Sequence, residues 1–167
     1  TLDGSNFLAN SYISGYVTMD DDYNIIRWIN ENTDVNDIVL EEQGKDFTYS
    51  NRVSTFTGRQ TVIGWRDHEW LWRSVDSSTE IPKEVNKRLN DVKKLYTEKN
   101  VEELKKLIEE YDISYIVIGF NERKSYATED LNLSVLDNEE ELKSLGEIVY
   151  ETNENNLTEP SYVIKIK

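Results

Sequence analysis

The stretch Tyr115-Ile116-Val117-Ile118-Gly119 is the clearest strand in the sequence. Its first four residues are aromatic or β-branched, and Gly119 ends the apolar run. A strand with no polar residue on either side of its pleat is expected to be covered on both faces. This strand therefore indicates a sheet with helices packed on both sides of it.

Helical patterns stand on both sides of this strand in the chain. Pro82 suits a first helical turn, and the apolar residues after it recur at helical spacing as far as Tyr96, which predicts a helix over residues 82–97. Asn100 followed by Glu103 predicts the start of another helix that runs to Tyr111. Further helices are expected over residues 21–32, where three aspartates open the pattern, and over residues 139–145.

Other short apolar runs predict the remaining strands. Residues 37–41, 52–55 and 61–65 read as short extended segments, and residues 147–152 and 161–167 alternate with period two as a closing antiparallel pair. Helices interleaved with buried strands predict an α/β fold, a three-layer Rossmann-like domain with a mostly parallel central sheet and an antiparallel C-terminal edge.

Length and charge limit what the chain can be. Its 167 residues fit one domain, in which residues 1–19 form an irregular lead-in. The formal net charge of −14 argues against nucleic acid and anionic membranes as partners, because such a surface repels phosphates. The chain has no cysteine, so neither a disulfide nor a thiolate metal site can form.

Candidate functional residues follow the ends of the predicted strands, where ligands bind in open α/β sheets. Glu41 follows one strand, and Glu122 and Arg123 come shortly after Gly119. The stretch between Gly64 and Arg73 is the densest in large functional side chains and contains three of the four tryptophans. The complete set of candidate ligand-binding residues is Glu41, Arg52, Trp65, His68, Glu69, Trp72, Arg73, Glu122 and Arg123.

Three interpretations of this set stay open. His68, the only histidine, could act as a general base oriented by Glu41, Glu69 or Glu122, since a carboxylate partner fixes the imidazole tautomer. Trp65 and Trp72 could instead stack on sugar rings while charged side chains bind hydroxyl groups. Alternatively, the aromatic side chains pack under a loop that a Glu69–Arg73 pair holds to the sheet.

Metal and cofactor chemistry is not expected. Asp20-Asp21-Asp22 resembles the Asp-X-Asp pattern of metal-dependent glycosyltransferases, but a cluster of acids at the start of a helix explains the same residues. One histidine without a thiolate is a poor zinc site, and the sequence contains no Gly-X-Ser-X-Gly nucleophile motif. We therefore expect no cofactor and no bound metal.

In order and spacing, a series of short motifs resembles the soluble C-terminal part of YYY-type polytopic membrane proteins of bacteria and archaea. The motifs are Thr1-Leu2-Asp3-Gly4, Ile25-Ile26-Arg27-Trp28-Ile29 with Asn32, Val39-Leu40-Glu41 with Gly44, Arg52-Val53-Ser54-Thr55-Phe56-Thr57-Gly58, Thr61-Val62-Ile63-Gly64-Trp65 with His68-Glu69 and Trp72-Arg73, Arg88 with Asp91-Val92 and Leu95-Tyr96, and Tyr115-Ile116-Val117-Ile118-Gly119 with Glu122-Arg123. The chain departs from the family at Glu42, where members commonly have a small apolar residue, and near Phe120, where they have a proline.

The resemblance implies a function for a larger protein. Members look like GT-C-type glycosyltransferases, in which a membrane-embedded portion carries the active site and a soluble domain follows on the extracytoplasmic side of the cell membrane. It implies an accessory domain excised from such a protein, with the membrane-spanning portion as its partner and a lipid-linked sugar or glycan as its ligand. The alternatives are a freestanding hydrolase-like enzyme centred on His68, and an aromatic module that binds carbohydrate or protein.

Overall fold

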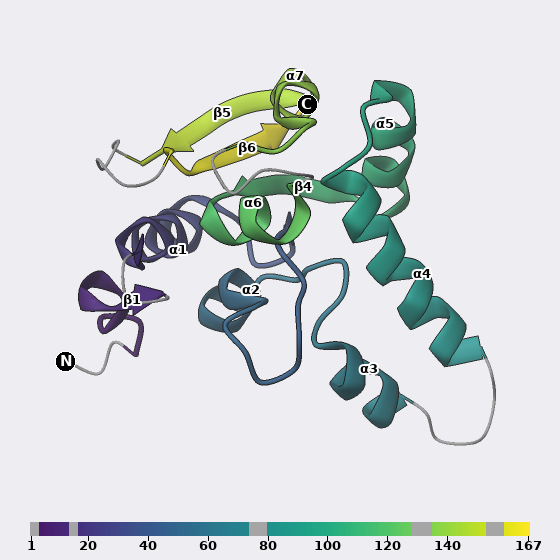
Figure 1. Cartoon of the computed structure of the whole chain (residues 1–167), viewed down its shortest axis with the longest axis horizontal. Helices are drawn as coiled ribbons and strands as arrows, with labels where there is room; N and C mark the ends of the chain where they lie inside the picture. The colour runs from purple at the N-terminus through teal and green to yellow at the C-terminus, as the bar shows by residue number, and fades with distance from the viewer. Residues whose placement is uncertain (1–3, 14–16, 74–79, 128–134, 153–158) are drawn as a thin grey trace.

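The computed structural model describes residues 4–13, 17–73, 80–127, 135–152 and 159–167 (Figure 1). Its elements, in chain order, are η1 (Leu8–Asn10), β1 (Tyr12–Ile13), β2 (Val17–Thr18), α1 (Asp20–Asn32), β3 (Ile38–Leu40), α2 (Arg52–Thr57), α3 (Arg66–Arg73), α4 (Glu80–Leu95), α5 (Val101–Glu110), β4 (Ile113–Ile118), α6 (Phe120–Tyr126), α7 (Glu139–Ser144), β5 (Gly146–Glu151) and β6 (Tyr162–Ile166). The mixed α/β class predicted from the sequence is confirmed.

The main sheet has the strand order β3-β4-β6-β5. β3 runs parallel to β4, with Leu40 opposite Ile116, whereas β4 pairs antiparallel with β6 and β6 pairs antiparallel with β5. The predicted antiparallel pair at the C-terminus is therefore confirmed. One parallel pair among the described strands is less than the mostly parallel sheet that we expected.

The apolar side chains of β4 point to both faces of the sheet, as its sequence predicts. Ile116 and Ile118 lie in a core with Leu95 and Leu104, from the end of α4 and from α5. Tyr115 and Val117 point to the other face, where they pack in a second cluster. That cluster contains Ile25 and Ile29 from α1 and Val53 from α2. Because successive side chains of a strand point to opposite faces, β4 is buried against helices on both faces of the sheet.

The extended conformation predicted for residues 52–55 is wrong, because these residues form the first turn of α2. The carboxylate of Glu41 accepts hydrogen bonds from the N–H groups of Val53 and Ser54, both at 2.7 Å, and so caps the start of this helix. Gly58, in a left-handed conformation with a φ of 70°, ends it. Tertiary capping therefore overrides the β propensity of Val53 and Thr55.

Residues 61–65 form no strand either. Among the described residues, the only ladder contact near them is an isolated bridge between Ile38 and Gln60 at the open edge of β3. Two helices, α3 and α6, occupy places where the sequence analysis predicts no element. α3 lies at the lower edge of the molecule in Figure 1, next to α4 and away from the sheet.

Candidate functional site

The carboxyl ends of β3 and β4 meet at one edge of the sheet, where ionisable side chains are buried together. Glu41 and Glu42 follow β3, and Glu122 lies in the first turn of α6, directly after β4. Arg52 reaches the same place from α2. A site is expected at this edge from the strand ends, and Arg52 and Glu122 of the predicted set are in direct contact there.

Arg52 joins two carboxylates, and we call Asp22, Arg52 and Glu122 the Arg52 clasp. The Arg52 Nη1 and Nη2 groups donate to the two oxygens of Glu122, each at 2.9 Å, and Nε donates to Asp22 Oδ1 at 2.7 Å. Glu122 also accepts hydrogen bonds from the backbone N–H groups of Glu42 and Gly119. The clasp ties α1, α2 and α6 to the sheet edge.

Burial and pairing act in opposite directions on the clasp. Burial opposes ionisation of Glu122, but Arg52 holds the pKa of Glu122 below its usual range. Burial would also lower the pKa of Arg52, but Asp22 and Glu122 raise the Arg52 pKa well above its usual value. The pKa of Asp22 is raised by its own burial, and Arg52 offsets this only in part. Glu122 and Arg52 therefore form a buried ion pair in which each favours the charged form of the other.

Glu41 lies beside the clasp without joining it. Burial raises the pKa of Glu41 to about 7, although Arg52 and the N–H groups of Val53 and Ser54 favour its charged form. Its two oxygens are both occupied by those N–H groups, so its role is to cap α2.

Arg123, the neighbour of Glu122, enters a second buried ion pair. Its Nη2 and Nε groups donate to the two oxygens of Glu139 at 2.9 and 3.1 Å, and Nη1 donates to the carbonyl of Pro160 at 3.0 Å. Burial would raise the pKa of Glu139, but Arg123 holds it below its usual range. This pair joins α6 to α7 and to the chain before β6.

These buried charges offer no reacting group to a ligand. Glu41, Arg52, Glu122 and Arg123 are all 2% exposed or less, and their polar atoms are directed to protein partners. Within the described ranges, no hydrogen bond or ion pair joins the His68 ring to Glu41, Glu69 or Glu122. The arrangement is that of a structural clasp.

The other predicted residues lie on or next to α3. Asp46 caps this helix, because its carboxylate accepts hydrogen bonds from the N–H groups of Asp67 and His68 at 3.2 and 3.0 Å. The indole N–H of Trp65 donates to the Ser50 carbonyl at 3.0 Å. The His68 ring stacks on Trp65 with 5.5 Å between centroids, and Phe47 packs against both rings.

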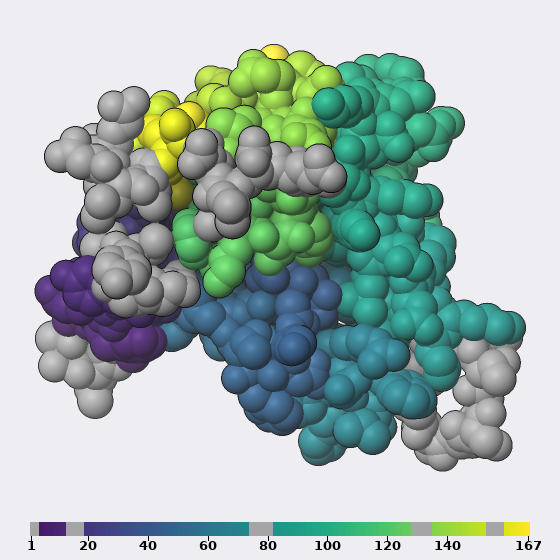
Figure 2. Space-filling view, in the orientation of Figure 1, coloured from purple at the N-terminus to yellow at the C-terminus, as the bar shows by residue number. Residues whose placement is uncertain are grey.

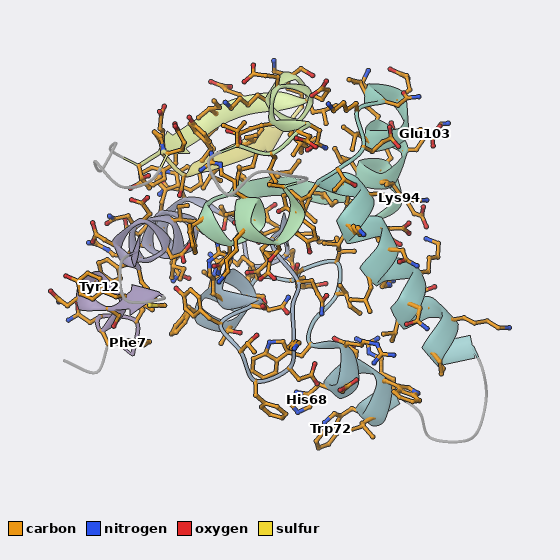
Figure 3. All side chains as sticks on the ribbon, in the orientation of Figure 1. Phe7, Tyr12, His68, Trp72, Lys94 and Glu103 are labelled. Atoms are coloured by element: carbon orange, nitrogen blue, oxygen red, sulfur yellow. The ribbon has the colours of Figure 1, made fainter. Side chains whose placement is uncertain are left out.

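Large apolar side chains of this region are exposed. Trp72 is 81% exposed, Phe47 77%, Leu71 72% and Trp70 42%. Residues three and four apart share one side of a helix, so Leu71 and Trp72 lie on the same side as His68 and its neighbour Phe47. We call Phe47, His68, Leu71 and Trp72 the aromatic face. Figure 3 shows His68 and Trp72 at the outer, lower edge of the molecule.

Glu69 and Arg73, also on α3, form an ion pair with each other. They face the cavity between α3, α4 and the segment over residues 60–63. In Figure 2 the segments that contain α2 and α3, in blue, lie beside α4, in teal, along the lower part of the molecule. The structure therefore places the nine predicted residues in two groups: a buried group at the sheet edge and an accessible group at α3.

Several residues that complete these groups are not among the candidates expected from the sequence. Asp22 belongs to an acidic helix start, but it also precedes Ile25, Ile26 and Ile29 by three, four and seven residues, which places it on the buried side of α1. That spacing predicts a buried position for Asp22. Asp46 and Phe47 reach their partners on and beside α3, and Glu139 reaches Arg123, only through the tertiary fold.

Comparisons with known proteins do not assign the chain to a family. No model of a known protein family matches it, and no curated protein matches its sequence. Among the described residues, no helix is long and apolar enough to cross a membrane. The described His, Asp and Glu side chains include no group of three or more that could hold a metal ion.

Proposed function

We propose that this chain is an accessory binding domain that holds a carbohydrate, as substrate or as acceptor, and does not catalyse a reaction on its own. Following the resemblance to YYY-type proteins, its partner is the membrane-spanning portion of the same polypeptide, which is similar to GT-C glycosyltransferases. In this proposal the domain lies on the extracytoplasmic side of the cell membrane. Its ligand is a glycan or the sugar part of a lipid-linked sugar.

The exposed aromatic face of α3 is the observation that carries this proposal. Trp72 and Phe47 present large apolar ring surfaces to solvent, and such a patch marks a place where another molecule binds. The ring face of a pyranose is apolar and its edge carries hydroxyl groups. An exposed indole therefore matches a sugar ring, while Arg66 and Asp67, both exposed, supply polar groups nearby.

The position of the carboxylates favours binding over catalysis. Most glycoside hydrolases use two carboxylic groups that flank the scissile bond. Glu41 and Glu122 are buried and occupied by protein donors. Glu69 and Glu84, which are accessible, are each paired with an arginine of their own helix. A domain built in this way is suited to hold a glycan for an active site elsewhere in the protein.

The fold suits this role as well. We infer that the sheet, with helices packed on both faces, is a short variant of the three-layer Rossmann-like arrangement. In this variant the ion-paired clasp fills the edge at which ligands commonly bind. Binding then takes place at the helices beyond that edge.

A binding screen tests the proposal directly. The labelled domain is applied to immobilised trisaccharides that contain glucose, mannose, galactose or N-acetylglucosamine. Wild type should bind at least one class. Trp72→Ala should weaken that binding about tenfold or more, because an aromatic side chain that the ligand buries contributes much of the binding free energy. Tyr12→Ala removes another exposed aromatic side chain, far from α3, and should bind as wild type does.

Two results would contradict the proposal. Absence of binding to every neutral glycan would remove its basis, and equal losses in Trp72→Ala and Tyr12→Ala would show that the aromatic face is not the site. The membrane partner is tested separately, by reading the gene upstream of Thr1. Hydrophobic helices encoded there support the parent protein that we propose, and a reading frame that starts near Thr1 contradicts it.

A further inference from the structure

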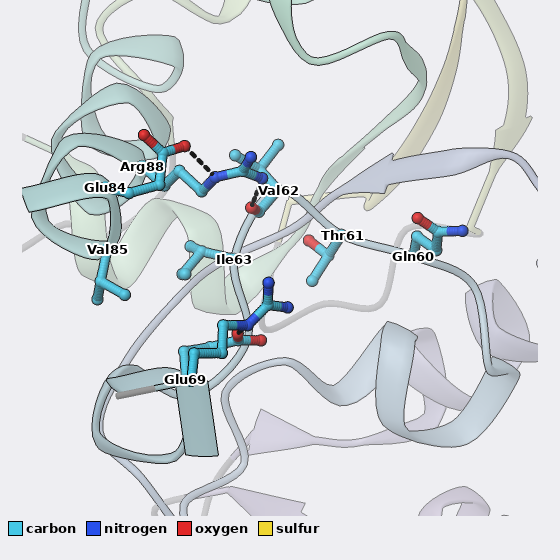
Figure 4. Close-up of a pocket in the computed structure, with 9 residues that line it drawn as sticks. Gln60, Thr61, Val62, Ile63, Glu69, Glu84, Val85 and Arg88 are labelled. Atoms are coloured by element: carbon cyan, nitrogen blue, oxygen red, sulfur yellow. Dashed lines mark hydrogen bonds and ion pairs between the residues drawn. The ribbon is translucent and has the colours of Figure 1, made fainter. Parts of the chain in front are cut away.

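A cavity of about 650 Å³ lies between α3, α4 and the segment over residues 60–63 (Figure 4). This volume is in the range of sites that hold drug-sized ligands, the size class of a short oligosaccharide. The lining residues are Gln60, Thr61, Val62, Ile63, Glu69, Arg73, Glu84, Val85 and Arg88. Of this set, only Glu69 and Arg73 are among the candidate ligand-binding residues expected from the sequence.

Two ion pairs form the walls of the cavity. On α3, Glu69 pairs with Arg73, and on α4, Arg88 Nε pairs with Glu84 at 2.7 Å. Arg88 also donates from Nη1 to the carbonyl of Val62 at 3.0 Å, which fixes its guanidinium at the cavity wall. The two glutamates and two arginines of these walls have opposite and equal charges. The cavity therefore offers strong hydrogen-bond donors and acceptors without a net charge.

The floor of the cavity is apolar. Val62, Ile63 and Val85 line it and are each 5% exposed or less. Figure 4 shows Ile63 between Glu84 on one side and Glu69 on the other, with Thr61 and Gln60 at the far end. A ligand in this space would meet apolar atoms below its ring and charged or amide groups around its edge.

We propose that this cavity binds a neutral carbohydrate through its ring face and its hydroxyl groups. This inference rests on the proposed function and names the place and the class of the ligand. A hydroxyl group donates and accepts, so it can bond to Glu84 and Arg88 without separating them. An anionic ligand, in contrast, would have to compete with Glu69 or Glu84 for an arginine, and the net charge of −14 would repel it.

Point variants and a matched control test the cavity. Each variant is titrated with the trisaccharide that binds wild type best in the screen above, and binding is measured by calorimetry. Glu84→Gln and Glu69→Gln should each weaken binding about tenfold, because each removes a charged acceptor from a sugar hydroxyl. Glu31→Gln removes the same kind of partner from an exposed i,i+4 pair with Arg27 on α1, and its affinity should equal that of wild type. Thermal unfolding checks that all three variants fold.

The outcomes separate this inference from the proposed function. If Trp72→Ala loses binding while Glu84→Gln and Glu69→Gln bind as wild type does, the glycan lies on the aromatic face; the cavity inference is then overturned, and the proposed function stands. If wild type binds none of the trisaccharides, both fail. Tighter binding of glucose 6-phosphate than of glucose would overturn the neutral class of ligand, and the reverse order supports it.

Discussion

Arg52 is a candidate ligand-binding residue in the sequence, but in the structure it stabilises the fold. It is fully buried, and its donors serve Asp22 and Glu122. A buried ion pair contributes little net free energy compared with an apolar replacement of both partners. Loss of one partner, however, leaves an unpaired charge in a medium of low dielectric constant.

Arg52→Met should therefore lower the free energy of unfolding by about 3 kcal/mol or more, since Asp22 and Glu122 lose their counter-ion. Urea unfolding followed by circular dichroism at pH 7 measures this loss. Arg27→Met is the control, because its pair with Glu31 is exposed and its loss should lower the free energy of unfolding far less. Equal losses in the two variants would mean that the clasp does not hold α1, α2 and α6 together.

Glu41 makes stability depend on pH. Its pKa is about 7 in the folded chain and has a reference value of 4.5, so the folded state holds more protons than the unfolded state between these values. Since the folded state binds the extra proton, the free energy of unfolding should fall as pH rises from about 4.5 to 7, by at most roughly 3 kcal/mol. Asp22 and Glu42, whose pKa values burial also raises, add to the fall.

Glu41→Gln isolates this contribution. The variant cannot ionise, so the fall in stability between pH 5 and pH 8 should be smaller than in wild type. Its overall stability should also drop, because an amide NH2 cannot accept a hydrogen bond from the start of α2. Urea titrations at several pH values give both quantities. An unchanged slope would show that Glu41 keeps an ordinary pKa.

At the scale of elements, local sequence predicts those helices and strands whose pattern agrees with their tertiary partners. α1, α4, α5 and β4 have apolar residues at the expected periods, and all were predicted near their observed bounds. α2 was missed because its start depends on Glu41, eleven residues before its first residue. α3 buries none of its residues, so an apolar period could not reveal it.

The end of α2 depends on the conformation of one glycine. Gly58 has a φ of 70°, and no atom outside its chain neighbours lies within 4 Å of the place where a Cβ would stand. Gly58→Ala should therefore cost about 1 kcal/mol through backbone conformation alone. Gly4→Ala also enters open space, but without a positive φ, and should leave the free energy of unfolding unchanged. A loss of equal size in both variants would contradict this explanation.

The start of α3 depends on Asp46. Asp46→Ala removes the acceptor for the N–H groups of Asp67 and His68 and should destabilise this helix by about 1 kcal/mol. Amide hydrogen exchange should become faster in α3 while β4 keeps its protection. Glycan binding should weaken in parallel, because both the aromatic face and the cavity need an intact α3. Unchanged exchange in α3 would show that another contact holds it.

For the whole molecule, the nine candidate residues expected from the sequence lie in two groups, and the sequence alone does not show this division. Glu41 and Glu122 are predicted at strand ends and lie at one sheet edge, where Arg52 from α2 pairs with Glu122. Whether those charges face solvent depends on how α1, α2 and α6 close over them, which no local pattern contains. The accessible charged side chains lie on α3 and α4. Glu84 and Arg88 line the cavity only because the tertiary fold brings α4 next to α3.

The central claim is that a glycan binds at α3 and the cavity and not at the Arg52 clasp. The amide chemical shifts of a ¹⁵N-labelled domain, titrated with the best-binding neutral trisaccharide, test it most directly. We predict that the amides that shift belong to α3, to residues 60–63 and to the α4 turn around Glu84 and Arg88. Amides next to Glu41, Arg52 and Glu122 should keep their positions. Shifts centred on those three residues, or no shifts anywhere, would contradict the account.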